Sequence, residues 1–269
     1  TYSPAIEYYQ QSLNIHRNTD NRYGEADSLN NLGNIYNLLG EYSQAIDCYQ
    51  QSLNIQREID NRSGEADSLN ALGNIYDALG DYLPAIDCHQ QCLNIYRETN
   101  NRRGLATSWR NLGSAYHSLG EYLPAIDCHQ QSLDMARKMN SKLREINSLT
   151  ALARTYVSLG EHQRAIEYSQ ESLNLAQQTD SHSGEANSLV TLGNAYSNLG
   201  NYLQAIELYQ QALNIQQEMS DRSGQATSWR NLGNVYRCLG QCQRAIEYSQ
   251  KSLEIARAIG EMASEGATL

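Results

Sequence analysis

The sequence predicts an all-α protein, a solenoid of antiparallel helix pairs, on three observations. An Ala-Ile pair recurs at a constant step of 40 residues, and no insertion or deletion breaks the register. Between these pairs, apolar residues recur at spacings of three and four, as one face of a helix requires. A glycine closes the first half of every unit, and such a fixed period indicates one helical unit stacked on copies of itself. These glycines are Gly40, Gly80, Gly120, Gly160, Gly200 and Gly240.

Each unit is predicted to begin with a shorter helix, which we call helix A. In residues 61–80, apolar side chains at Leu69, Leu72 and Ile75 lie on one helical face. Gly80 then ends helix A, because glycine adopts the positive φ that is common at helix C-termini. The first half of the unit is therefore one amphipathic helix.

A longer helix, which we call helix B, follows after a tight turn. In the same unit it opens at Ala85, carries Leu93 on its apolar face, and fades at Asn100 and Asn101. Asn is a favoured N-cap residue, so this position is expected to cap the next helix A. A first helical turn also tolerates a residue without an N–H group, and three prolines precede an Ala-Ile pair. They are Pro4, Pro84 and Pro124.

The register predicts a single solenoid over residues 1–269 that begins and ends inside a unit. Residues 1–20 match a lone helix B, and residues 261–269 match the start of a further helix A. Native arrays end in polar capping helices. We therefore expect a piece of a longer array, with apolar ends able to stack head to tail. The six full repeats are 21–60, 61–100, 101–140, 141–180, 181–220 and 221–260.

Two units carry a nearly complete signature of W-x2-L-G-x2-Y followed by A-x3-aromatic. The chain thereby resembles the tetratricopeptide repeat (TPR) family, in a long variety similar to repeats of spindle-orientation adaptors and of bacterial TPR signalling proteins. The resemblance covers essentially the whole chain. It implies a right-handed α-solenoid, the TPR superhelix, whose concave face is lined by helix A. The residues at the signature positions are Trp109, Leu112, Gly113, Tyr116, Ala125 and His129, then Trp229, Leu232, Gly233, Tyr236, Ala245 and, in place of the aromatic residue, Ser249.

One position of each helix A holds a small residue. It allows helix A to approach helix B closely, where a larger side chain would separate them. The small residues are Gly33, Gly73, Gly113, Ala153, Gly193 and Gly233.

One position of each helix B departs from the family pattern. The family has a closing proline there, which Arg or Gln replaces in this chain. The replacements are Arg57, Arg97, Arg137, Gln177, Gln217 and Arg257.

Composition excludes several classes of function. The formal net charge of −10 and the pI of about 5.1 argue against a nucleic-acid partner, which needs clustered Lys and Arg. No run of apolar residues is long enough for a transmembrane helix, and the first residues lack the pattern of a signal peptide. We therefore expect a cytoplasmic protein without a membrane partner.

Polar residues form columns along the predicted helix A face. A side-chain amide both donates and accepts hydrogen bonds, so a column of Asn suits the backbone of an extended peptide. The alternative, that these residues are solvated side chains on an exposed helix face, stays open. The predicted partner-binding residues are Asn30, Asn34, Asn70, Asn74, Arg110, His117, Arg154, Asn194, Arg230, Asn234 and Arg237.

The columns differ in charge along the chain. The first two units contribute Asp27, Asp67 and Asp77, whereas the arginines come from later units. Arg binds a carboxylate through two hydrogen bonds at once. We therefore predict that acidic side chains of a ligand lie against the later units and basic ones toward the start.

Cysteine and histidine do not form a convincing metal site in the sequence. Cys88, His89 and Cys92 are close, but they lie on one helix, whereas structural zinc sites place paired cysteines on turns. Both His89 and His129 occupy the aromatic position of helix B, where other units have Tyr. We predict no metal, no cofactor and free buried thiols. A local disulfide between Cys238 and Cys242 is conceivable on spacing alone.

No catalytic constellation is visible, because every glycine belongs to the repeat register or lies near a helix end, and no carboxylate stands out from its repeat equivalents. The most divergent unit is 141–180, which drift in a tolerant repeat or a local specialisation would explain. We predict a non-enzymatic scaffold that binds a protein or peptide in the concave groove. The alternatives are a regulatory arm of a larger signalling enzyme, such as a caspase-like protease or a nucleotide-binding ATPase, and a self-assembling structural element.

Overall fold

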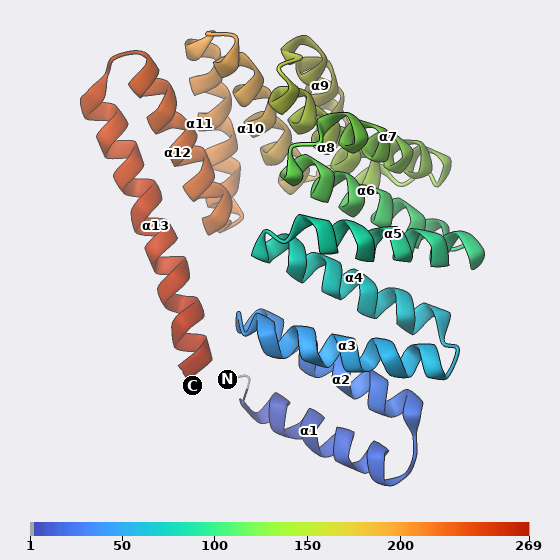
Figure 1. Cartoon of the computed structure of the whole chain (residues 1–269). Coiled ribbons are helices and arrows are strands. Elements are labelled where there is room, and N and C mark those ends of the chain that lie inside the picture. Colours follow the sequence, from blue (N-terminus) through green and yellow to red (C-terminus); the bar gives the residue numbers. More distant parts are fainter. Residues whose placement is uncertain (1–2, 269) are drawn as a thin grey trace. The chain divides into compact units, whose positions relative to one another are not determined.

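The computed structural model describes the backbone of residues 3–268 and the side chains of residues 4–260. The described backbone consists of thirteen α-helices and contains no strand, which confirms the all-α class (Figure 1). Even-numbered helices are helix A and odd-numbered helices are helix B. The helices are α1 (Ser3–Asn18), α2 (Arg22–Leu38), α3 (Tyr42–Glu58), α4 (Arg62–Leu79), α5 (Tyr82–Glu98), α6 (Arg102–Leu119), α7 (Tyr122–Lys138), α8 (Lys142–Leu159), α9 (His162–Gln178), α10 (His182–Asn198), α11 (Tyr202–Glu218), α12 (Arg222–Cys238) and α13 (Cys242–Thr268).

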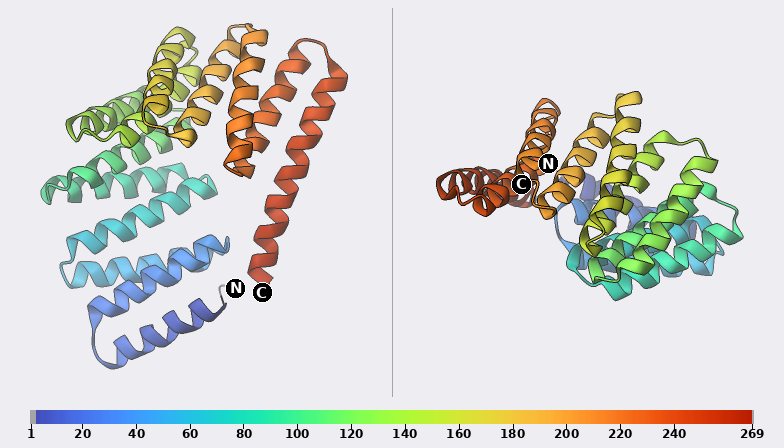
Figure 2. Two further views of the ribbon diagram at one scale, coloured as in Figure 1. Left: turned by 180° about the vertical axis from the view of Figure 1, so that it is seen from behind. Right: turned by 90° about the horizontal axis from the view of Figure 1, so that it is seen from above.

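The chain divides into two compact units, residues 1–121 with 262–269 and residues 122–261. Within each unit, a helix packs against the next helix along the chain, and Figure 2 shows these neighbours running antiparallel. Successive A helices also touch, as α4 does with α6 and α10 with α8 and α12. Short connections therefore place consecutive helices side by side, as the sequence predicts.

Two kinds of turn connect the helices, and both use positive φ. The turn from helix A to helix B contains the recurring glycine, as at Gly80 with φ of 83°. The turn from helix B to helix A uses a residue with a side chain, at φ values from 49° to 57°. Asp and Asn tolerate this region better than most residues. The B-to-A turn residues are Asp20, Asp60, Asn100, Asn140, Asp180 and Ser220.

Side chains cap several A helices at their first turn. Asn101 accepts a hydrogen bond from the backbone N–H of Gly104 at 3.0 Å, as expected for this position. Asn21 and Asp221 accept the equivalent bond at 3.0 and 2.9 Å. Each cap satisfies one of the N–H groups that a helix N-terminus leaves unpaired.

The predicted close approach of helix A to helix B is confirmed. Tyr49 packs on Gly33, where a Cβ would meet its ring at 2.7 Å. His89 covers Gly73 in the same way, and a Cβ there would lie 2.5 Å from the imidazole. His89 therefore fills the aromatic position of its helix, as the sequence indicates.

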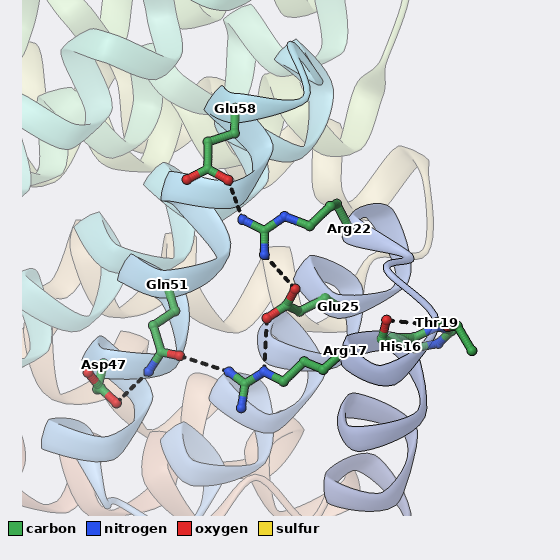
Figure 3. A network of polar contacts seen from close by, with 8 residues as sticks. All are labelled: His16, Arg17, Thr19, Arg22, Glu25, Asp47, Gln51 and Glu58. Atoms are coloured by element: carbon green, nitrogen blue, oxygen red, sulfur yellow. Dashed lines mark hydrogen bonds and ion pairs between the residues drawn. The ribbon is translucent and has the colours of Figure 1, made fainter.

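A repeated ion cluster joins each of three A helices to the preceding helix B, as Figure 3 shows for the first case. Glu25 is only 7% exposed and lies between Arg17 of α1, at 2.9 Å, and Arg22 of its own helix, at 2.6 Å. Arg22 also binds Glu58, and Arg17 donates to Gln51 at 3.3 Å. This cluster was not predicted from the sequence.

The same arrangement recurs around two further buried glutamates. Arg57 binds Glu65 at 2.8 Å and Arg137 binds Glu145 at 3.1 Å. These arginines occupy the position of the family's closing proline, so the replacement side chain reaches forward to the next helix A. Where that helix has no Glu, Arg97 instead lies over the ring of Trp109, 5.2 Å from its centroid.

Helix α13 differs from the other B helices. It continues without a break from Cys242 to Thr268, so the turn that other units have at the corresponding position is missing near residue 260. The side chains of residues 261–269, where the sequence predicts the start of a further helix A, lie outside the described residues.

Candidate functional site

The predicted partner-binding residues all lie on A helices, and most of them face solvent. Those that are exposed are Asn34, Asn74, Arg154, Arg230, Asn234 and Arg237. Those that are half-buried are Asn30, Asn70, Arg110, His117 and Asn194.

Three of these residues lie together in a pocket of about 340 Å³ between α8, α10 and α12. Asn194, Asn234 and Arg237 line it, with Val157 as an apolar wall. Because its walls come from three successive A helices, the pocket lies on the helix A face. The other lining residues are Ser197, Asn198, Tyr209, Asn231 and Cys238.

The orientation of the Asn194 amide is determined by internal hydrogen bonds. The Tyr209 hydroxyl donates to Asn194 Oδ1 at 2.7 Å, and Asn231 Nδ2 donates to the same oxygen at 3.1 Å. Burial raises the pKa of the Tyr209 hydroxyl, so it remains a neutral donor. Both lone pairs of the Asn194 oxygen are therefore used, and the N–H groups of the same amide remain as donors for a ligand in the pocket.

The same Tyr–Asn pair occurs in the repeat of residues 21–60. The Tyr49 hydroxyl donates to Asn34 Oδ1 at 2.7 Å, and burial raises its pKa to about 12. The amide of Asn34 is thus oriented like that of Asn194. The aromatic position of helix B, which the sequence suggested as a packing position, also orients the Asn of the groove.

Asn111 and Asn231, which were not among the predicted residues, link neighbouring A helices. Asn111 Nδ2 donates to Asn70 Oδ1 at 3.0 Å and to Asn74 Oδ1 at 3.3 Å, so it connects α6 to α4. Asn231 makes the corresponding link from α12 to α10. The available signal was an Asn on the apolar side of helix A, because a buried amide needs partners.

Asp77, one of the acidic residues predicted for the groove, interacts with another side chain of the protein. Its Oδ2 lies 3.2 Å from His89 Nε2, and His89 is fully buried. The first two repeats therefore offer a ligand less free acidic charge than the sequence suggests, because only Asp27 and Asp67 of the three predicted aspartates are exposed.

The described residues contain no cluster of three or more His, Cys, Asp or Glu side chains placed to hold a metal ion. Cys48, Cys88, Cys92 and Cys128 are buried and free, while Cys238 and Cys242 are free and exposed. Across residues 3–268, no helix has both the length and the apolar character needed to span a bilayer.

A family model described as tetratricopeptide repeat matches the chain in overlapping segments. The segments are 4–58, 26–98, 64–138, 104–178, 144–218 and 184–258. The chain belongs to the tetratricopeptide repeat family. This confirms the resemblance inferred from the Leu-Gly-x2-Tyr motifs. The comparison with curated proteins found no match.

Solved structures show the same fold at low sequence identity. The apo form of RapI superposes with a TM-score of 0.76 at 15% identity, over 96% of this chain and 99% of that one. A Rap protein complexed with Competence and Sporulation Factor gives 0.68 at 16%, over 94% and 77%. A STAND protein with a tetratricopeptide repeat sensor, from Pyrococcus horikoshii, gives 0.70 at 17%, over 91% and 39%.

Proposed function

We propose that this TPR protein is a non-enzymatic, cytoplasmic scaffold that binds a partner protein or peptide along its helix A face. The pocket between α8, α10 and α12 would anchor an acidic group of the ligand. The observation that carries this proposal is the hydrogen-bonded orientation of Asn194 beside the exposed Arg237.

At Asn194 and Arg237 the pocket offers hydrogen-bond donors and positive charge. Asn194 has its oxygen occupied, and Arg has no acceptor at all. A carboxylate fits this arrangement, because hydrogen bonds between charged partners are roughly twice as strong as neutral ones. Val157 adds an apolar contact for the stem of the acidic side chain.

The other predicted contacts extend this proposal along the A helices. Asn34 presents the same oriented amide in the first unit, and its N–H groups suit the backbone carbonyls of an extended segment. Arg154 and Arg230 are exposed in the second compact unit, residues 122–261, and add positive charge to its helix A face. The predicted preference for acidic residues therefore belongs to this compact unit.

A peptide array tests the proposal. Fluorescently labelled protein is applied to immobilised 12-residue peptides that are acidic, neutral or basic, and the affinity of the best acidic peptides is then measured in solution. We expect acidic peptides to be enriched, and Arg237→Glu to weaken their binding at least about tenfold. Arg222→Glu makes the same charge change at the exposed first turn of α12 and is the control, with less than about a twofold effect. Equal losses in both variants, or no acidic preference, would contradict the proposal.

A second candidate is a regulatory arm of a larger signalling enzyme. The observation that favours it is the fold shared with the tetratricopeptide repeat sensor of the STAND protein. Sequencing the gene on both sides of the segment encoding residues 1–269 tests it, since a protease or nucleotide-binding domain in the same reading frame would support this role.

A further inference from the structure

A second pocket, of about 520 Å³, lies in the repeat of residues 141–180, on α8 and α9 (Figure 1). Tyr156 of α8 lines it together with four side chains of α9, which are Arg164, Glu167, Tyr168 and Glu171. The rings of Tyr156 and Tyr168 stack with their centroids 5.5 Å apart. The pocket therefore combines aromatic rings with two carboxylates, and it shares no lining residue with the pocket between α8, α10 and α12.

Two departures of the most divergent repeat meet in this pocket. At the position of Tyr168, the three preceding repeats have cysteine, and at the position of Glu171 they have glutamine. An aromatic ring and a carboxylate thus replace a small thiol and a neutral amide in one place. This grouping favours a local specialisation of the repeat, because unrelated changes have no reason to meet in a single pocket.

The repeat of residues 221–260 contains the same pair of tyrosines and shows which group lies against them. Its Tyr236 and Tyr248 stack with their centroids 5.1 Å apart. The ammonium nitrogen of Lys251 lies 5.4 Å from the centroid of Tyr248 and 4.8 Å from that of Trp229, distances typical of cation–π contacts. The same nitrogen binds a carboxylate oxygen of Glu247 at 2.8 Å. In this repeat, an aromatic ring and a carboxylate therefore hold a primary ammonium that the chain itself supplies.

The repeat of residues 141–180 keeps the ring and the carboxylate but not the ammonium. Tyr168 and Glu167 are the counterparts of the ring and the carboxylate, whereas Glu171 replaces the lysine. Leu149 replaces the tryptophan and is fully buried, so the aromatic contact in this pocket is left to the tyrosines. Glu167 accepts a hydrogen bond from the neutral side chain of Gln163 at 3.4 Å.

The two arginines beside the pocket bind carboxylates other than that of Glu167. Arg164 binds Glu161 at 2.9 Å, and Arg137 of α7 binds Glu171 at 2.5 Å. Among residues 4–260, no ion pair involves Glu167. A cation that enters the pocket would therefore supply the counter-ion of this carboxylate.

We propose that the pocket on α8 and α9 binds a lysine side chain of a partner protein, with its ammonium between the ring of Tyr168 and the carboxylate of Glu167. Lys251 shows within the same chain that one ammonium contacts both kinds of group at once. Charge complementarity supports the same occupant, because Glu167 is negative and has no cationic partner of its own. The inference goes beyond the proposed function and does not rest on it, since it concerns another pocket and the opposite charge.

A peptide selection followed by a solution measurement tests the proposal. The full chain is applied to immobilised 12-residue peptides, otherwise neutral and varied in sequence, whose central residue is lysine, trimethyllysine or norleucine. The tightest lysine peptide is labelled with fluorescein, and its affinity is measured by anisotropy. We expect lysine to be enriched, and its replacement by norleucine, which has the same stem without the ammonium, to weaken binding at least about tenfold.

Two substitutions in the pocket and one outside it assign the binding site. Tyr168→Cys introduces the residue that three other repeats have at this position, and it should weaken binding of the lysine peptide at least about fivefold. Glu171→Lys should weaken it at least about tenfold, because the chain's own ammonium would then compete for Glu167. Glu207→Lys makes the same charge change on the exposed surface of α11 and is the control, with less than about a twofold effect. Circular dichroism checks that all three variants keep their helix content.

Several outcomes would overturn the proposal. Equal losses in Glu171→Lys and Glu207→Lys would show only the general attraction of an acidic protein for a cation. Unchanged affinity in Tyr168→Cys, or no enrichment of lysine, would exclude the pocket as a lysine site. Stronger enrichment of trimethyllysine would contradict a primary ammonium, because trimethylation removes the N–H groups that donate to Glu167.

The same variants distinguish this proposal from the proposed function. Tyr168→Cys should leave acidic-peptide binding unchanged, because Tyr168 does not line the pocket between α8, α10 and α12. Arg237→Glu should weaken acidic-peptide binding and leave the affinity for the lysine peptide within about twofold, because Arg237 does not line the pocket on α8 and α9. Each proposal can therefore fail while the other holds.

Discussion

At the scale of single residues, the turn from each helix B to the next helix A depends on one side chain held at positive φ. Five of the six turns use Asp or Asn, and only Ser220 departs from this choice. Asp and Asn tolerate the left-handed region because their short polar side chains bond to the local backbone. The turn after α11 is therefore the one with the least suitable residue.

Ser220→Gly is expected to stabilise the protein by up to about 1 kcal/mol, because glycine removes the Cβ penalty at φ of 57°. The free energy of unfolding in urea is the measurement. Gln210→Gly, on the exposed middle of α11, is the control and should destabilise by roughly 0.5–1 kcal/mol. Destabilisation by both substitutions would refute the conformational explanation.

The glycine beneath each aromatic side chain gives a second residue-scale prediction. Gly73→Ala places a Cβ 2.5 Å from His89 and should cost about 1–3 kcal/mol, although Ala is normally the better helix former. The chain itself contains the compensated combination, Ala153 with Ser169. The double variant Gly73→Ala/His89→Ser should therefore lose less stability than the sum of the two single variants. Simple additivity in urea unfolding would show that the contact is not the cause.

At the scale of helices, the buried glutamate of helix A connects it to the helix B before it. Glu25 and Glu145 are each 7% exposed and bound by two cationic side chains. Burial alone raises the pKa of the Glu145 carboxyl, but hydrogen bonds from Lys142 and Arg137 outweigh it, and the pKa is lowered overall. The carboxylate is therefore better stabilised in the folded chain than in the unfolded one.

This pKa shift predicts how stability depends on pH. A carboxyl whose pKa is lowered on folding adds stability above its unfolded pKa of about 4.5, and this stability disappears as pH falls through the lower folded value. Glu145→Gln should cost about 1–3 kcal/mol at pH 7, and the difference from wild type should shrink at pH 3. Urea unfolding at both pH values is the measurement. Glu185→Gln is the control, since Gln177 rather than Arg binds Glu185, and its effect should be smaller.

At the scale of the whole molecule, the six cysteines fall into two classes by burial. Burial raises the pKa of the Cys48 and Cys88 thiols to about 11, and that of the Cys92 and Cys128 thiols to about 12. Since the thiolate is the reactive form, these four side chains are inert by both charge and access. Cys238 and Cys242, on either side of an A-to-B turn, are exposed.

Ellman's reagent is therefore expected to modify two thiols in the native protein at pH 8 and six after denaturation. The substitution Cys238→Ser should lower the native count to one and leave the melting temperature unchanged. Rapid modification of four or more thiols in the native protein would contradict the packing of α3, α5 and α7. An unreactive native protein would instead indicate that Cys238 and Cys242 had formed a disulfide.

Sequence patterns alone were enough to predict the helix pairs, the turns at the recurring glycines and the close approach of helix A to helix B at Gly73. These features follow from periodicity and local conformational preference, which act within about one repeat. Which polar groups meet depends on how the helices pack in three dimensions. Arg57 stood out in the sequence only as a missing proline, yet it reaches a buried Glu65, and Asn231 fixes the amide of Asn194 on another helix. Such pairs join side chains of neighbouring repeats, and their distances depend on how the helices cross and rotate. A repeat period does not specify those angles.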